Sequence, residues 1–203
     1  MTISPDRRQR LVVMVKEPRA GRVKTRLGKE IGMTAAAWWF RHQTTRLLRH
    51  VQDPRWQTIL AASPDHAGLH SRVWPEHFDR MPQGQGDLGQ RMARIFHRLP
   101  PGPSIIIGAD IPAIRRHHIA CAFQELGRHQ AVFGPSTDGG YWLVGLKRTA
   151  GQKKGLFRNV RWSSRHALQD TLQSFGDLSV GYAATLADID TAADLKQAFS
   201  PRR

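Results

Sequence analysis

Short, continuous apolar runs alternate along the chain with longer segments in which apolar residues recur every three or four positions. A continuous run is typical of a strand covered on both faces, and the longer period is typical of a helix. The predicted strands are Leu11–Val15, Gln57–Ala62, Ser104–Ala109, Ala131–Phe133 and Tyr141–Leu146, with a weaker one near 77–81 and an apolar stretch at Leu178–Ala183.

Helices are predicted between these runs. They lie at Thr34–Val51, from Gly89 toward Pro100, from Pro112 through Leu126, from a cap at Ser163 or Ser164 through Phe175, and near 192–199. This alternation, without an internal repeat, indicates one three-layer α/β domain over residues 1–203, with 1–10 as a flexible basic tail. We expect the loop 147–154 to be mobile and Cys121, between two alanines, to be buried.

Charge is the unusual bulk property of the sequence. Lys and Arg number 31 against 16 Asp and Glu, which gives a net charge of +15. A positive field favours a phosphate-rich partner such as a nucleotide. The basic residues are scattered, however, and neither zinc-finger spacing nor an aromatic RNA-binding motif is present. A nucleic-acid partner is therefore not favoured.

Compartment and assembly follow from a few residues. The apolar run Leu11–Val15 is far too short to cross a bilayer, and no signal-peptide pattern precedes it. With Cys121 as the single cysteine, no internal disulfide or thiolate cluster can form. We expect a cytoplasmic protein without a membrane span. Trp38, Trp39 and Phe40 present more aromatic surface than one helix face buries easily, so a homodimer is one interpretation of this run.

Asp110 is the first candidate for chemistry. The apolar run that begins at Ser104 stops on this single carboxylate, and Pro112 follows. In α/β proteins, ligands collect at the carboxyl ends of strands, and Gly108 and Ala109 leave room there. A cap on the following helix explains the same carboxylate, so both interpretations stand at this stage.

A basic loop, Lys16–Gly28, follows the first strand. Cations and free backbone amides on such a loop can hold a pyrophosphate. The loop lacks both the Gly-Lys-Ser/Thr ending of a phosphate loop and the spaced glycines of a dinucleotide fingerprint. The predicted nucleotide or phosphate contacts are Lys16, Gly21, Lys24, Thr25 and Arg26.

Asp87 lies in a second glycine-rich segment, 83–92, at the start of a predicted helix. Its carboxylate could bind a base or a ribose hydroxyl, but its spacing favours a helix cap.

A third loop contains Asp138, Gly139 and Gly140 and leads into Tyr141. The sequence Asp-Gly-Gly between two apolar strands is typical of a hairpin turn, and exposed amides in a wide loop could also contact an acceptor. Gly139, Gly140 and Tyr141 are therefore candidate acceptor contacts.

Asp188 and Asp190 are alternate carboxylates late in the chain. On an extended segment they point to opposite sides, so one of them could join Asp110 around a divalent ion. Magnesium would keep waters and take substrate phosphates as further ligands. His117 and His118 are neighbours on a predicted helix and cannot face one ion.

These five motifs, in their order along the chain, resemble the small glycosyltransferase-A-like family associated with arsenosugar biosynthesis. More distantly, they are similar to nucleotidyltransferases of the same nucleotide-diphospho-sugar transferase superfamily. The resemblance implies a Rossmann-like, mixed and mostly parallel sheet, with a nucleotide diphosphate over the first half and a small-molecule acceptor over the second.

The resemblance also implies roles for single residues. Asp110 would bind Mg²⁺ or Mn²⁺ together with Asp188 or Asp190, the basic loop would bind phosphates, and Asp138 would act as the general base. Two features depart from the family pattern. Ala192 stands where proline often follows Asp-Thr, and a lone Asp110 replaces the Asp-X-Asp triplet of many glycosyltransferases.

Three functions follow from the sequence. The leading hypothesis is a metal-dependent glycosyltransferase that uses a nucleotide-diphospho-sugar. The second is a guanylyltransferase-like enzyme that joins a nucleoside triphosphate to a small phosphorylated acid, and the third is a basic binding protein without catalysis. Pyrophosphate would leave in nucleotidyl transfer, and a nucleoside diphosphate would leave in glycosyl transfer.

Overall fold

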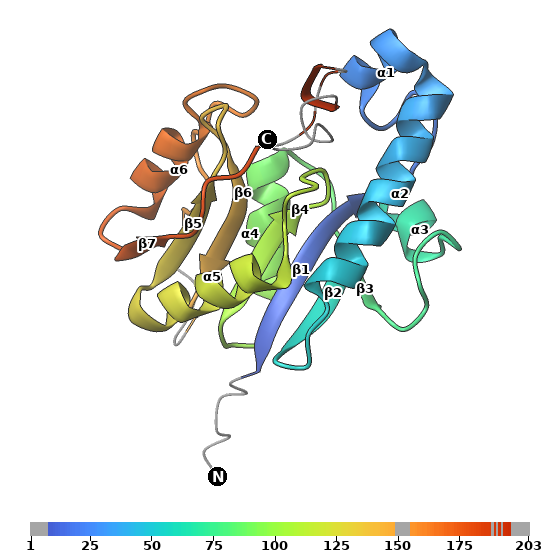
Figure 1. Cartoon of the computed structure of the whole chain (residues 1–203). Coiled ribbons are helices and arrows are strands. Elements are labelled where there is room, and N and C mark those ends of the chain that lie inside the picture. Colours follow the sequence, from blue (N-terminus) through green and yellow to red (C-terminus); the bar gives the residue numbers. More distant parts are fainter. Residues whose placement is uncertain (1–7, 149–154, 188, 190, 192, 196–203) are drawn as a thin grey trace, which may run out of the picture.

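The computed structural model describes residues 8–148, 155–187, 189, 191 and 193–195 (Figure 1). Its strands are β1 (Gln9–Lys16), β2 (Trp56–Ser63), β3 (Asp79–Pro82), β4 (Ser104–Gly108), β5 (Ala131–Pro135), β6 (Tyr141–Leu146) and β7 (Val180–Tyr182). Its helices are α1 (Thr25–Ile31), α2 (Met33–Val51), α3 (Asp65–Leu69), α4 (Leu88–Arg98), α5 (Arg116–Arg128) and α6 (Ala167–Phe175).

The strands form a single sheet in the order β3-β2-β1-β4-β6-β5-β7. Strands β1 to β4 pair in parallel, and β5 pairs in parallel with β7. Strand β6 lies antiparallel between β4 and β5. The predicted mixed, mostly parallel sheet is confirmed.

Helices cover both faces of this sheet (Figure 1). Residues of α2 and α5 pack with Leu11, Val13 and Val15 of β1 in one core cluster. Residues of α4 and α6 pack with Val12 on the other face. Because successive side chains of a strand point to opposite faces, a continuous apolar run supplies both cores. The three-layer α/β prediction is confirmed.

The centre of the sheet contains a topological switch point. The chain leaves β1 to form β2 on one side and later returns to form β4 on the other. In open α/β sheets, ligands bind in the crevice at the carboxyl ends of the strands where this reversal occurs. The loop after β1 and the residues after β4 meet at that point.

Several predicted details differ from the structure. Gln9 and Arg10 belong to β1 and not to a tail, and Arg10 is 2% exposed. Cys121 is exposed, because α5 buries the face that carries Ile119, Ala122 and Phe123. The short helices α1 and α3 were not predicted.

Two further predictions fall largely on residues 149–154, 192 and 196–199, which lie outside the described residues. They are the mobile loop 147–154 and the last helix. Among the helices of the described part of the chain, none combines the length and apolar character needed to cross a bilayer.

Candidate active site

Asp110 lies just beyond β4 and contacts the loop that follows β1. Its Oδ2 accepts a hydrogen bond from Lys24 Nζ at 2.9 Å. The Lys24 side chain is 8% exposed, whereas that of Asp110 is 38% exposed. The pair therefore joins two of the predicted motifs, with the lysine behind and the carboxylate open to solvent.

The backbone at Lys24 is in the left-handed conformation, with φ 45° and ψ 49°, directly before α1. This conformation costs a residue other than glycine about 1–2 kcal/mol. Strain of this kind persists where surrounding contacts hold it, and it is often found at functional sites. The ion pair with Asp110 is one such contact.

A first cavity of about 420 Å³ opens between this loop, the end of β1 and Asp110. Five cationic side chains and a single carboxylate are among its lining residues. The cations are Lys16, Arg22, Lys24, Arg26 and Arg91, and the carboxylate is Asp110. A cavity with this balance of charge suits a diphosphate, which guanidinium groups can bind in a bidentate manner. Because the sequence resemblance implies a nucleotide diphosphate over this half of the sheet, we call it the donor cavity.

The wall of the donor cavity is held by a buried amide. The Gln83 side chain is 4% exposed and donates to the backbone carbonyls of Val15 and Ala61, at 3.0 and 2.8 Å. Arg94 donates in turn to the carbonyls of Gln83 and Gln85. The glycine-rich segment therefore forms a rigid wall that extends from the ends of β1 and β2.

The predicted phosphate contacts divide into two groups. Lys16, Lys24, Thr25 and Arg26 line the donor cavity. Gly21 and Asp87 are not among the residues that line it. Asp87 caps α4, because its carboxylate accepts from the Gln90 amide at 2.8 Å in a capping box. The cap that the spacing favoured is confirmed.

A second cavity, of about 610 Å³, lies on the other side of Asp110. It shares Met14, Arg26, Gly108 and Asp110 with the donor cavity. Beside several aliphatic residues, three aromatic side chains and five polar ones line it. They are Tyr141, Trp142 and Trp162, with Ser136, Asp138, Ser163, Ser164 and Arg165. Because the sequence resemblance implies an acceptor over the second half of the sheet, we call it the acceptor cavity.

Asp138 lies in the hairpin turn between β5 and β6 and lines the acceptor cavity. Its Oδ1 accepts from the Gly140 amide at 2.9 Å, which fixes the turn, and the predicted hairpin is confirmed. Gly140 and Tyr141 also line the acceptor cavity, whereas Gly139 does not appear in its lining.

Gly139 has a different task, because it lets two loops approach closely. Its φ is 88°, and a Cβ at this position would lie 2.3 Å from the carbonyl oxygen of Arg165. Its own carbonyl accepts from the Leu168 amide at 3.1 Å. The hairpin turn is thereby joined to the segment that precedes α6.

Replacing Gly139 with alanine is expected to disturb the acceptor cavity. The strained φ and the backbone clash should lower the free energy of unfolding by about 1–3 kcal/mol. Gly127→Ala is the matched control, because a Cβ there meets nothing within 4 Å and should be neutral or slightly stabilising. Chemical denaturation of both variants checks this, and equal stabilities would contradict the role assigned to Gly139.

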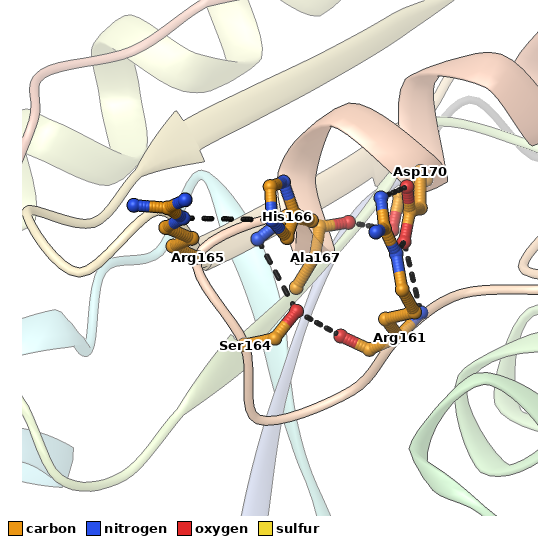
Figure 2. Close-up of polar contacts among 7 residues, drawn as sticks. Arg161, Ser164, Arg165, His166, Ala167 and Asp170 are labelled. Carbon is orange, nitrogen blue, oxygen red and sulfur yellow. Dashed lines mark hydrogen bonds and ion pairs between the residues drawn. The ribbon is translucent and has the colours of Figure 1, made fainter.

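An ion pair holds the segment that carries Arg165 (Figure 2). Arg161 donates to both carboxylate oxygens of Asp170 at 2.8 Å, and its backbone amide donates at 3.0 Å. Ser164 Oγ donates to the Arg161 carbonyl and accepts from the His166 amide. Figure 2 shows the guanidinium of Arg165 extending away from the Arg161–Asp170 pair.

This arrangement corrects the predicted helix cap. The N-cap of α6 is His166, whose side chain makes no capping hydrogen bond. Ser163 and Ser164 precede His166 in the chain and line the acceptor cavity. The hydroxyl of Ser164 stabilises the turn before the helix and not the helix end itself.

The Asp170 ion pair makes stability depend on pH. Hydrogen bonds from the Arg161 side chain hold the pKa of Asp170 well below its usual 3.8. A lowered pKa gives stability that is present above the unfolded pKa and is lost as the pH falls below it. We expect Asp170→Asn to be less stable than wild type at pH 7 and to lose less stability between pH 5 and pH 2. Melting temperatures across this range check it, and parallel curves would contradict it.

Tyr141 is a poor candidate for the base. Burial raises the pKa of its hydroxyl, and the Thr171 hydrogen bond at 3.4 Å only partly offsets this. The phenol therefore stays protonated at neutral pH. Asp138 remains the carboxylate beside Tyr141 in the acceptor cavity lining.

Some cavity residues were not predicted from the sequence. Arg22 lies inside the basic loop that was singled out, and Arg91 lies inside the second glycine-rich segment, so both had a local signal. Trp162 and Arg165 had none beyond their place before a predicted helix. They reach the site because their segment docks on the β5–β6 hairpin.

The predicted metal ligands are only partly described. Asp110 lies at the wall shared by the two cavities. Asp188 and Asp190 lie outside the described residues. Within the part of the chain that the structure describes, no three His, Cys, Asp or Glu side chains gather as a metal site would require.

A family model matches residues 46–164, and its description is uncharacterized protein conserved in bacteria (DUF2064). The chain belongs to the DUF2064 family. No curated protein matches the sequence. The matched region of this DUF2064 protein includes β4, Asp110 and the β5–β6 hairpin.

Solved structures show the same fold. A candidate nucleotide-diphospho-sugar transferase from Desulfovibrio desulfuricans G20 is 26% identical, with a TM-score of 0.80 over 94% of this chain and 86% of that one. This likeness supports the nucleotide-diphospho-sugar transferase superfamily and leaves the arsenosugar assignment a prediction.

More distant structures agree on the fold alone. Rv0371c from Mycobacterium tuberculosis H37Rv, in complex with manganese, is 17% identical, with a TM-score of 0.55 over 94% of this chain and 97% of that one. The 4-diphosphocytidyl-2C-methyl-D-erythritol synthase from Anaerococcus prevotii DSM 20548 is 10% identical, with a TM-score of 0.57 over 95% and 96%.

Proposed function

We propose that this DUF2064 protein is a metal-dependent glycosyltransferase that takes a sugar from a nucleotide-diphospho-sugar and passes it to a small-molecule acceptor. The observation that carries the proposal is the position of Asp110. It lies in the wall shared by a strongly basic cavity and a mixed aromatic and polar one. A transfer reaction needs its two substrates held next to each other, with charged groups at the place where they meet.

The donor diphosphate fits the donor cavity by charge. Lys24 and Arg26 lie closest to the junction, since Lys24 contacts Asp110 and Arg26 lines both cavities. Lys16, Arg22 and Arg91 line the same donor cavity. When the sugar leaves, negative charge grows on the diphosphate, and these cations stabilise that charge.

The acceptor fits the second cavity. The aromatic side chains of Tyr141, Trp142 and Trp162 offer an apolar surface, and Ser163, Ser164 and Arg165 offer hydrogen-bond donors. Asp138 is the proposed base for an acceptor hydroxyl, held by its hydrogen bond from Gly140. A role in arsenosugar biosynthesis belongs to the same proposal, carried by the sequence resemblance alone.

The described donor set fits magnesium or manganese in a particular way. Asp110 offers a hard, accessible carboxylate, and magnesium is often held by one or two carboxylates together with waters and substrate phosphates. We expect Asp110, with Asp188 or Asp190, to hold the ion. When bound, it would neutralise charge on the diphosphate leaving group.

One observation favours a second function, nucleotidyl transfer to a small phosphorylated acid. The described site holds a lone Asp110 in place of an Asp-X-Asp triplet. The chain also shares its fold with the 4-diphosphocytidyl-2C-methyl-D-erythritol synthase from Anaerococcus prevotii. The basic donor cavity suits a nucleoside triphosphate as well as a nucleotide sugar.

The product that leaves separates the two functions. Purified protein is incubated with magnesium or manganese and panels of nucleotide sugars and nucleoside triphosphates, and phosphorus NMR identifies the products. Release of a nucleoside diphosphate supports glycosyl transfer, and release of pyrophosphate supports nucleotidyl transfer. If no member of the panels is bound or turned over, the transferase proposal is overturned. Binding that is independent of metal, without any turnover, would instead favour a basic binding protein.

A further inference from the structure

A third cavity, of about 530 Å³, lies between the end of α2 and the start of α5. It shares no lining residue with the donor or the acceptor cavity. Six of its eight lining residues are basic. They are Arg49, His50, Arg55, Arg115, Arg116 and His117. We call this cavity the arginine hollow.

The carboxylate beside the hollow is already neutralised. Asp53 has a side chain that is 8% exposed and accepts from Arg55 at 2.8 and 3.0 Å. Arg116 approaches the same carboxylate at 3.5 Å. Side-chain hydrogen bonds from Arg55 lower the pKa of Asp53 to about 2, so it stays ionised and bound. Two of the four arginines that line the hollow, Arg55 and Arg116, thus approach this carboxylate.

The pKa of His50 reflects the positive charge around the hollow. Its pKa is lowered first by burial and then by the positive charges of Arg115, Arg46 and Arg49. No carboxylate contributes to this shift. Arginines of α2 and the N-cap residue of α5 therefore repel a further positive charge, and an anion placed there would be attracted by the same groups.

We propose that the arginine hollow binds a small phosphorylated molecule at a site separate from the donor and acceptor cavities. Guanidinium groups present planar pairs of donors that match phosphate oxygens. The arginines line one hollow from the end of α2, the connection before β2 and the start of α5. A nucleic-acid strand instead uses a basic groove that follows its backbone across the surface. The hollow therefore suits a compact anion better than a polymer.

Inorganic pyrophosphate is the probe for this proposal. Two-dimensional amide NMR of the whole protein distinguishes binding in the hollow, which shifts signals of residues 49–56 and 115–121, from binding in the donor cavity, which shifts those of residues 22–26. We expect both sets to move, and the hollow set to move less at high salt. Side-chain NMR should show a higher pKa for His50 in the complex, since an anion favours the imidazolium.

Charge removal completes the test. Arg49→Ala and Arg116→Ala should each weaken pyrophosphate binding in the hollow by about tenfold or more, with donor-cavity binding unchanged. Arg41→Ala removes an exposed arginine from the same helix, outside the hollow, and should leave the affinity unchanged.

Three results would overturn the proposal. They are donor-cavity shifts alone, equal affinity of the Arg49, Arg116 and Arg41 variants, or a single-stranded RNA that shifts the hollow signals where pyrophosphate does not. None of them bears on turnover in the donor cavity, so the proposed transferase activity stands or fails separately.

Discussion

Replacing Asp110 with asparagine is expected to reduce turnover with the nucleotide donor by at least about a hundredfold, because a divalent ion contributes several kcal/mol of charge stabilisation. Asparagine keeps the shape of the side chain but loses the negative charge that a metal ion requires. The expected loss concerns turnover more than folding, because the aspartate side chain is 38% exposed. Initial rates at saturating magnesium measure it.

Asp177→Asn is the matched control for this variant. Asp177 is exposed and lies beyond α6, and neither the donor nor the acceptor cavity includes it. We expect wild-type turnover from it. If Asp110→Asn retained more than about a third of wild-type turnover, Asp110 would be only a structural ion-pair partner of Lys24. The helix-cap interpretation of the sequence is wrong, because the N-cap of α5 is Arg115.

Replacing Lys24 with methionine is expected to change two affinities in opposite directions. Binding of the nucleotide should weaken by about tenfold or more, since a charge-assisted contact to phosphate is lost. Binding of Mn²⁺ without nucleotide should tighten, because Lys24 no longer competes for Oδ2 of Asp110. Calorimetry with each ligand separately measures both effects.

Lys29→Met provides the comparison, because Lys29 is exposed in the last turn of α1 and lines neither the donor nor the acceptor cavity. Both of its affinities should match wild type. Weaker Mn²⁺ binding in Lys24→Met would contradict the account, because it would mean that Lys24 supports the metal position instead of competing for it.

The sheet was predictable because its signal is local. A strand buried on both faces needs apolar residues at every position, and the runs at β1 and β4 satisfy this directly. The same reasoning placed Asp110 at a strand end, and the sheet order then puts it at the switch point between β1 and β4. The Asp-Gly-Gly turn predicted the antiparallel pairing of β5 with β6, but the place of β6 beside β4 was not predicted, because no local pattern specifies which distant strands pair.

Helix α1 shows where local patterns fail. Of its seven residues, only Leu27 and Gly28 are buried, so no apolar period distinguishes it from a basic loop. Cys121 shows the related limit for α5. Alanine neighbours indicate a helix but not its rotation, and packing of Ile119 and Phe123 turns the cysteine outward.

The candidate site was predicted in its parts but not in its contacts. Lys24 and Asp110 were each singled out, yet their ion pair joins residues 86 positions apart, which spacing does not reveal. Arg165 enters the site only because Gly139 allows two backbones to meet. Long-range docking of this kind depends on the folded structure.

A crystal structure with Mn²⁺ and the nucleoside diphosphate that most raises the melting temperature tests the central claim most directly. The account predicts an anomalous manganese peak at coordination distance from the Asp110 carboxylate, with the diphosphate on Lys24 and Arg26 and the acceptor cavity open beside it. A diphosphate bound elsewhere, with Lys24 still paired to Asp110, would contradict it.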